Sequence, residues 1–169
     1  MPLTAAPTIV GPDDGESVTL QTIGVRFMIP GADSDTRFSL VEHPIPPRGL
    51  AAPLHRHNRE DEYSYILEGR MGALLGDDLV EAGPGDLVYK PRGQWHTFWN
   101  AGDEPARILE IISPAGFEQF FAELGPLASG GAPDPEAMGE LCARYGLDMQ
   151  PDTPPELCKR FGLWFPDVD

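Results

Sequence analysis

Two histidines one residue apart are the clearest chemical feature of this 169-residue sequence, which contains four histidines in all. They are His55 and His57 in the stretch PLHRHNREDEYSYILEG. Alternate side chains of an extended strand lie on one face, so these imidazoles would lie about 7 Å apart at the backbone and could reach one metal ion at about 2.0 to 2.1 Å. A polar strand edge exposed to solvent gives the same spacing. The pair alone therefore leaves a metal site and a surface strand as alternatives.

Acidic residues crowd the stretch that follows the two histidines. The segment NRED before Glu62 is rich in turn-forming residues, so the chain can reverse there and direct Glu62 back toward the imidazoles. We interpret Glu62 as the one member of this group that binds metal. Glu60 and Asp61 are interpreted as solvated turn residues, and Glu68, next to a glycine at the strand end, as a surface residue.

Short apolar or alternating runs, separated by Gly, Pro, Asn and Asp clusters, fill the chain from Val18 to Ile112. Their regular spacing predicts a mainly-β sandwich or barrel. The runs are VTLQTIGVRFMI, RFSLVEH, EYSYILEG, GALLG, DLVYK, WHTFWN and ARILEII. The 19 prolines and 19 glycines agree with a structure that contains many turns.

Helical periodicity replaces strand alternation in the last third of the chain. We predict a first helix from residues 113–114 to a stop at Gly125, a second over 134–146 with Asp134 as its N-cap, and a third from a capping-box pattern at 153–156. The apolar face of the first is Phe117, Phe120, Phe121 and Leu124. We expect one domain, with a barrel over residues 1–113 and a helical extension over 114–169 that packs on it.

Ten fixed positions in one order indicate a family. Residues 49–69 follow the pattern G-x5-H-x-H-x4-E-x6-G, and residues 85–100 follow G-x5-P-x-G-x2-H-x3-N. These patterns resemble the two motifs of the cupin superfamily, each complete and separated by 15 residues, near the short end for the family. The resemblance covers residues 49–100 and implies a double-stranded β-helix, that is, a jelly-roll barrel.

The cupin resemblance implies a fourth protein ligand, His96, beside His55, His57 and Glu62. Three imidazoles and one carboxylate suit a divalent transition metal such as Fe, Mn, Ni, Co, Cu or Zn far better than Ca or Mg. The chain does not say which of these ions is bound.

Strand parity adds candidates for the wall of a substrate pocket. If His96 points inward, Phe98 and Asn100 also do. By the same count Ser64 and Ile66 accompany Glu62 inside, and Tyr63 and Tyr65 do not. Core packing explains Phe98 and Ile66 equally well. His43 matches neither motif and is interpreted as a structural or surface histidine.

Two classes of function remain open for such a site. The segment SPAGFEQFFAELG resembles the part after the barrel in small single-domain cupins that are quercetin 2,3-dioxygenase-like. That likeness favours a dioxygenase acting on a small enol, phenolic or flavonol-like substrate, with Glu62 as the catalytic base. The alternative is a non-redox metal-containing cupin, either an isomerase, epimerase or lyase or a small-molecule binding protein. Because the chain has only two lysines, an apolar substrate is favoured over sugar phosphates or carboxylates.

The net charge of −15 argues against nucleic acid and anionic membranes as partners, because both are bound through clustered Lys and Arg. We expect a cytoplasmic protein with two free, buried thiols at Cys142 and Cys158. We also expect a homodimer that buries the early VTLQTIGVRFMI run, since a long apolar edge strand invites aggregation.

Overall fold

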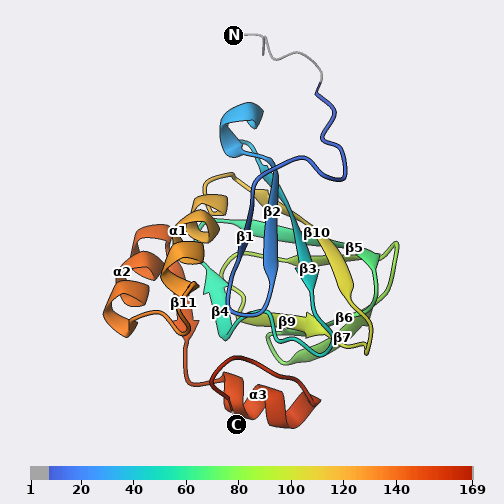
Figure 1. Ribbon diagram of the computed structural model, residues 1–169, viewed down its shortest axis with the longest axis vertical. Coiled ribbons are helices and arrows are strands. Elements are labelled where there is room, and N and C mark those ends of the chain that lie inside the picture. The colour runs from blue at the N-terminus through green and yellow to red at the C-terminus, as the bar shows by residue number, and fades with distance from the viewer. Residues whose placement is uncertain (1–7, 169) are drawn as a thin grey trace.

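Two antiparallel β-sheets form the body of the protein in the computed structural model, which describes residues 8–168 (Figure 1). The larger sheet holds, in spatial order, β1 (Ser17–Thr19), β2 (Gly24–Ile29), β3 (Ser39–Ile45), β10 (Ala106–Ser113), β5 (Asp61–Glu68) and β8 (Leu87–Lys90). The smaller sheet holds β11 (Leu147–Gln150), β4 (Leu54–His57), β9 (His96–Asn100), β6 (Met71–Leu75) and β7 (Asp78–Ala82). The mainly-β barrel predicted from the sequence is confirmed.

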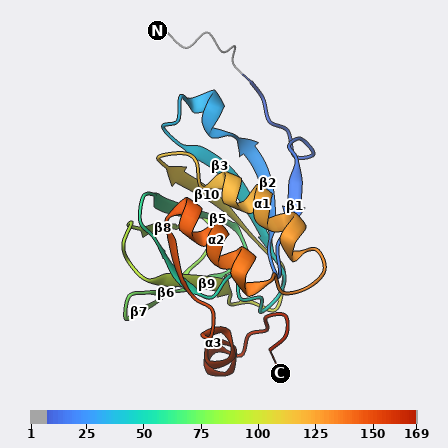
Figure 2. The ribbon, with the colours of Figure 1, turned by 90° about the vertical axis from the view of Figure 1, so that its left-hand side faces the viewer.

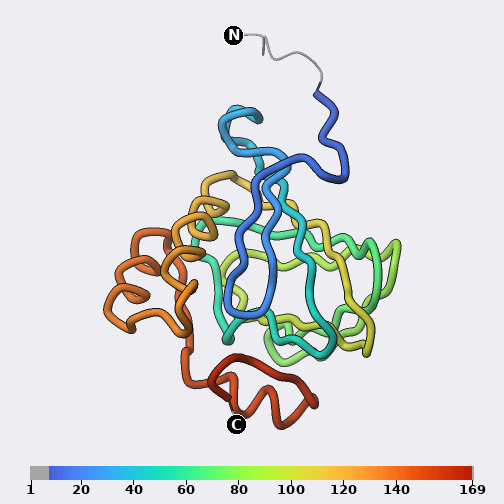
Figure 3. Tube along the Cα trace, in the orientation of Figure 1, coloured from blue at the N-terminus to red at the C-terminus, as the bar shows by residue number. Residues whose placement is uncertain are grey.

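Alternation along the strands builds the interior of this barrel. Every second side chain of β10 is buried, which places Ile108 and Ile112 inside. In β5 the inward positions include Ser64 and Ile66, while Tyr65 on the other face is 39% exposed, as parity predicted. The tube in Figure 3 shows the strands of the two sheets enclosing one interior.

Three α-helices follow β10, and the first two cover one open side of the barrel (Figure 2). They are α1 (Glu118–Ala128), α2 (Pro135–Tyr145) and α3 (Pro154–Phe161); a short 3₁₀ helix, η1 (Gly31–Ser34), precedes β3. The start of α2 is as predicted, because Asp134 accepts hydrogen bonds from the backbone N–H groups of Glu136 and Ala137. No helix in residues 8–168 is long and apolar enough to cross a membrane.

The predicted bounds of α1 were wrong at both ends. The helix begins at Glu118 and continues through Gly125 and Pro126 to Ala128. Gly125 does not end the helix; it allows close packing, since a Cβ there would lie 3.0 Å from the Cβ of Val18 in β1. The close approach of β1 to α1 therefore explains why a glycine occupies position 125 inside the helix.

The carboxyl-terminal third is not wholly helical. Leu147–Gln150 form β11, which pairs with β4 and extends the smaller sheet. The capping box of α3 is also not formed. The Thr153 hydroxyl accepts a hydrogen bond from the backbone N–H of Leu54 and donates one to the carbonyl of Gln150. Thr153 thus ties the start of α3 to the strand that carries the histidine pair.

The early apolar run forms a hairpin and not one long edge strand. A turn at residues 20–23 separates β1 from β2, and β1 is the three-residue edge of the larger sheet. The homodimer therefore stays a prediction. Light scattering at micromolar concentration should give twice the mass of one chain, and a monomer would contradict it.

Candidate metal centre

Three histidines meet inside the barrel at the junction of two paired strands. His55 and His57 project from β4, and His96 lies directly opposite His55 on β9. All three are buried, and one ring nitrogen from each lies within 4.8 Å of the other two. This confirms that the His-x-His pair is not a surface strand edge and that a histidine from the second motif joins it.

Hydrogen bonds fix the orientation of two of these rings. The Nδ1–H of His55 donates to the carbonyl of Pro53 at 2.7 Å, and the Nδ1–H of His96 donates to the carbonyl of Gln94 at 3.0 Å. Because a carbonyl only accepts, each Nε2 keeps its lone pair for another partner. The backbone thus presets two imidazoles as nitrogen donors.

Buried ring nitrogens without hydrogen-bond partners show that the site fits a metal ion. Among the described residues they include both nitrogens of His57 and the Nε2 of His96. Leaving a buried polar atom unsatisfied costs about 1 to 3 kcal/mol. Burial lowers the pKa of His57 to about 4 and that of His55 well below its usual value, so both rings are neutral at pH 7, the form that binds metal.

Glu62 on β5 lies beside two of the three histidines. Its Oε2 is 3.4 Å from the Nε2 of His57 and 3.3 Å from the Nε2 of His96. Burial by itself raises the pKa of Glu62, but electrostatic interactions with His57, Lys90 and His96 outweigh burial and bring that pKa well below its usual value. The side chain is therefore a carboxylate, and its role as fourth ligand stays a prediction.

A buried lysine that the sequence analysis did not single out stands behind Glu62. The Nζ of Lys90 on β8 lies 3.0 Å from Oε2 of Glu62 and 3.0 Å from Oε1 of Glu110 on β10, and it sits over the Phe98 ring at 4.6 Å from the centroid. Strand pairing explains this cluster, because Lys90 is directly opposite Glu62 and Glu110 is directly opposite Ser64. The Ser64 hydroxyl donates to Oε2 of Glu110 at 2.7 Å.

The pKa values of the two carboxyl groups that share Lys90 are shifted in opposite directions. Burial raises the pKa of Glu110 to about 7, although the positive charge of Lys90 opposes this rise. Burial alone would lower the pKa of Lys90, yet the charges of Glu110 and Glu62 raise it. Near pH 7 the cluster thus contains an ionised Glu62, a charged Lys90 and a partly protonated Glu110.

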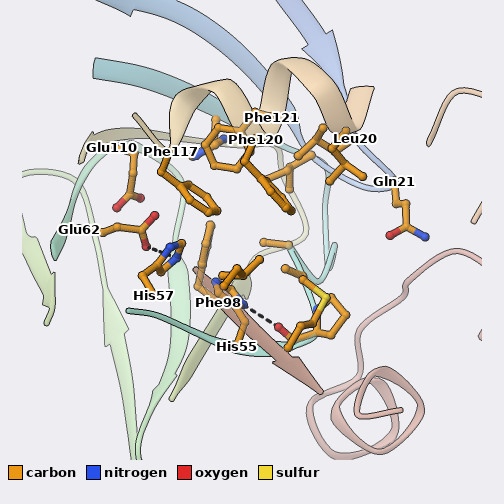
Figure 4. Close-up of a pocket in the computed structure, with 18 of the residues that line it drawn as sticks. Leu20, Gln21, His55, His57, Glu62, Phe98, Glu110, Phe117, Phe120 and Phe121 are labelled. Atoms are coloured by element: carbon orange, nitrogen blue, oxygen red, sulfur yellow. Dashed lines mark hydrogen bonds and ion pairs between the residues drawn. The ribbon is translucent and has the colours of Figure 1, made fainter. Parts of the chain in front are cut away.

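An apolar cavity of about 70 Å³ opens directly onto this centre (Figure 4). We call it the inner chamber. Its polar lining includes His43, His55, His57, Glu62 and Glu110, and its apolar lining includes Phe98, Leu124 and the three phenylalanines at the start of α1, Phe117, Phe120 and Phe121. The ring of Phe117 packs edge-on against that of His57, with the centroids 4.3 Å apart. The helical extension therefore supplies one wall of the site.

The sequence-predicted pocket residues separate into two groups. Phe98 lines the inner chamber, whereas Ile66 and Asn100 lie outside its lining. Ile66 is in the hydrophobic core, and the Asn100 side-chain amide donates to the backbone carbonyls of residues 45, 46 and 104. Asn100 thus holds the loops at the far end of β9, away from the metal centre.

The interpretation of Glu60 as a solvated turn residue was wrong, whereas Asp61 is partly exposed but lies at the start of β5 and not in the turn. Glu60 is buried, with one carboxylate oxygen 4.0 Å from the Nδ1 of His57, and burial raises its pKa to about 7. Asp61 accepts three hydrogen bonds from Arg92, two of them from its guanidinium. Local sequence gives no sign of either outcome, since both depend on the chain folding back after β4. Glu68 is exposed, as expected.

His43 is structural in one respect, because its Nδ1–H donates to the carbonyl of Gly24. It is also buried, and burial lowers its pKa from 6.5 to about 4.

This shift of the His43 pKa makes stability depend on pH. As the pH falls from about 6.5 to about 4, His43 becomes protonated in the unfolded chain but stays neutral in the folded chain, so the free energy of unfolding decreases on acidification. We expect His43 to contribute about 3 kcal/mol to this loss. Urea unfolding of the metal-free protein gives the free energy of unfolding at pH 7 and at pH 4.5. The difference between these two values should be smaller in His43→Gln than in the wild type.

Both sequence motifs lie within the match to a known family. Residues 42–112 match the family model for the Cupin domain. The solved structure of the polyketide cyclase RemF from Streptomyces resistomycificus is 30% identical, has a TM-score of 0.55, and is matched over 64% of this chain and 80% of that one. The chain belongs to the cupin superfamily.

Curated relatives resemble this cupin over shorter stretches. The uncharacterized protein MJ1618 of Methanocaldococcus jannaschii is 38% identical over 65 residues, which is 38% of this chain and 52% of that protein. The tetracenomycin polyketide synthase protein TcmJ of Streptomyces glaucescens is 31% identical over 89 residues, which is 53% of this chain and 58% of that protein. The cupin spans about half the length of these curated relatives.

Proposed function

We propose that this cupin is a metal-dependent, non-redox enzyme that removes a proton next to a carbonyl group in an apolar, polyketide-like substrate and so promotes ring closure. The observation that carries the proposal is the position of Glu62, a buried carboxylate that faces an aromatic cavity and touches two of the three clustered histidines. Two relatives, TcmJ and RemF, are named for polyketide chemistry, which supports the substrate class.

The residues of the chain have distinct parts in this scheme. His55, His57 and His96 would hold the metal ion, which when bound polarises a carbonyl oxygen. Glu62 accepts a proton from the carbon next to that carbonyl. That carbon then forms the new bond with a second carbonyl carbon of the same molecule, whose oxygen takes up a proton, so no oxidant is consumed. Lys90 keeps Glu62 ionised, and the phenylalanines of α1 keep water away from the reacting atoms.

Proton exchange at a simple ketone tests this proposal. Protein loaded with Zn²⁺, which has no redox chemistry, should accelerate exchange of the protons beside the carbonyl of 4-phenylbutan-2-one in deuterated water, followed by NMR. Glu62→Gln should slow this exchange by about 10² to 10⁴-fold, because a positioned base contributes that much. Glu68→Gln, an exposed position on the same strand, should exchange like the wild type. Equal rates in the wild type and Glu62→Gln would contradict the role of Glu62.

The dioxygenase function expected from the sequence stays a prediction. Protein loaded with Fe²⁺ and mixed with a flavonol in air distinguishes the two functions. Stoichiometric oxygen consumption, together with no ketone exchange in the Zn²⁺ form, would favour the dioxygenase. Ketone exchange without oxygen consumption would favour the non-redox enzyme.

A further inference from the structure

A second and larger cavity lies outside the inner chamber. Its volume is about 860 Å³, and we call it the outer chamber. One face of α2 lines it with Pro135, Met138, Gly139, Cys142 and Ala143, at the spacing of a single helix face. The opposite walls come from β11 and from residues 165–168 after α3. All of these elements follow residue 112, where the family match ends.

The two chambers adjoin. Residues that line both are Gln21, Pro53, Met138, Leu147 and Met149. Figure 2 shows α2 lying next to α1 across one side of the barrel, and Leu124 of α1 and Met138 of α2 both line the inner chamber. Met138 and Met149 thus lie between the two chambers. Because unbranched methionines adapt readily to different shapes, an extended molecule that displaces these two side chains would reach from the outer chamber toward the metal centre.

The volumes of the two chambers limit how much of a ligand can lie in each. The inner chamber, at about 70 Å³, is less than half of the roughly 150 Å³ cavity that accepts a benzene ring. The outer chamber, at about 860 Å³, is within the range of about 300 to 1,000 Å³ that holds whole small-molecule ligands. Only a few atoms of a substrate fit beside the histidines, and the bulk must lie outside.

We propose that the outer chamber binds the distal apolar part of the substrate, so that the enzyme acts on one end of an elongated, uncharged or cationic molecule. This inference rests on the proposed function, because it takes the metal centre as the place of reaction. It goes further, because it assigns a substrate-binding role to α2 and β11. It also implies that a compact ring system cannot enter the inner chamber as a whole.

Charge narrows the ligand class. Among the described residues that line the outer chamber there is no Lys or Arg, and the acidic ones are Asp148, Asp152 and Asp167. Asp148 is paired with Arg56, whose Nε lies 2.8 Å from its carboxylate, whereas no ion pair involves Asp152 or Asp167 within the described part of the chain. A ligand with a carboxylate at its distal end would be repelled by these aspartates, and added salt would weaken this repulsion.

Three ketones with the same reacting end test the proposal. They are butan-2-one, 4-(biphenyl-4-yl)butan-2-one, and the same biphenyl ketone with a carboxylate on the outer ring. Binding to the Zn²⁺-loaded protein is measured by equilibrium dialysis, and proton exchange by NMR. We expect the neutral biphenyl ketone to bind at least about tenfold more tightly than butan-2-one, because its rings leave water. The carboxylated ketone should bind several-fold more weakly than the neutral one at low salt, and less so at high salt.

Filling the outer chamber with a larger side chain should remove the tighter binding of the biphenyl ketone relative to butan-2-one. Gly139 is an exposed helical position where an added Cβ meets nothing within 4 Å, so Gly139→Phe introduces a ring into the chamber without a clash at its base. Ala143, an exposed residue that lines the chamber one turn later, provides the second variant, Ala143→Phe. In both variants the affinity ratio of the biphenyl ketone to butan-2-one should fall at least about fivefold. Gly83→Phe, at an open glycine outside both chambers, is the matched control and should keep the wild-type ratio.

The outcomes separate this inference from the proposed function. Tight binding of the biphenyl ketone that both phenylalanine variants weaken, without any proton exchange in the wild type, would support the chamber and contradict the proposed reaction. Exchange with equal affinity for the short and long ketones, or a ratio that neither variant changes, would overturn the chamber. Equal binding of the neutral and carboxylated ketones at low salt would overturn the charge preference.

Discussion

Replacing His96 with Ala should reduce bound metal from one ion per chain to below about one tenth. The reason is geometric, since the three imidazoles converge within 4.8 Å and two of them cannot replace the third. The same loss is expected for His57→Ala. Metal content after loading and dialysis, measured by mass spectrometry, gives the result directly.

A stability measurement provides an independent readout of the metal site. An ion that binds only the folded chain stabilises it by RT ln(1 + [L]/Kd), about 2.7 kcal/mol at one hundred times Kd. We therefore expect added Zn²⁺ to raise the melting temperature of the wild type and to leave that of His96→Ala unchanged. His43→Gln is the matched control, since His43 is a buried histidine whose Nδ1–H is taken by Gly24. Full metal content in both His57→Ala and His96→Ala would reject the site.

The metal-free protein should stay folded. The barrel has a hydrophobic core of its own, which includes Val41, Ile66 and Ile108, and this core does not depend on the histidines. Complete unfolding on chelation would instead show that the ion is structural.

The residues of the candidate metal centre were predictable because their signal is local. His55, His57 and Glu62 lie within eight positions, and strand parity alone orients the two histidines. The same parity correctly separated Ser64 and Ile66 from Tyr65. The second motif added His96, which the register places opposite His55. For these residues the spacing in the chain carries the three-dimensional information.

Lys90 and Glu110 were missed because a charged residue in a strand is ordinarily read as solvent-exposed. Strand alternation nevertheless indicated that both side chains point inward. Lys90 follows inward-facing Val88 by two residues, and Glu110 stands between Ile108 and Ile112, both fully buried. Their pairing across three strands depends on contacts distant in sequence, which no local pattern shows. The same holds for β11, a four-residue strand recognised only by its pairing with β4.

The second large effect concerns the two lysines of the chain. Lys90 is fully buried between two carboxyl groups, whereas Lys159 is exposed on α3. Lys90→Met should lower the free energy of unfolding of the metal-free protein by about 3 to 5 kcal/mol, because it leaves Glu62 and Glu110 buried without a counter-charge. Lys159→Met should change it by less than about 0.5 kcal/mol. Urea unfolding at pH 7 measures both values.

The loss caused by Lys90→Met should depend on pH and on the second carboxyl group. Without the lysine charge, burial raises the pKa of both carboxyl groups in the folded state, so the folded chain holds protons that the unfolded chain has released above about pH 4.5. The variant should therefore lose more stability at pH 8 than at pH 5. Adding Glu110→Gln should recover more than about 1 kcal/mol of the loss, since it removes a buried carboxyl group that must be either charged or protonated at a cost, and the Ser64 hydroxyl keeps an acceptor. A loss below about 1 kcal/mol, the same at both pH values, would show that Lys90 does not compensate the two carboxylates.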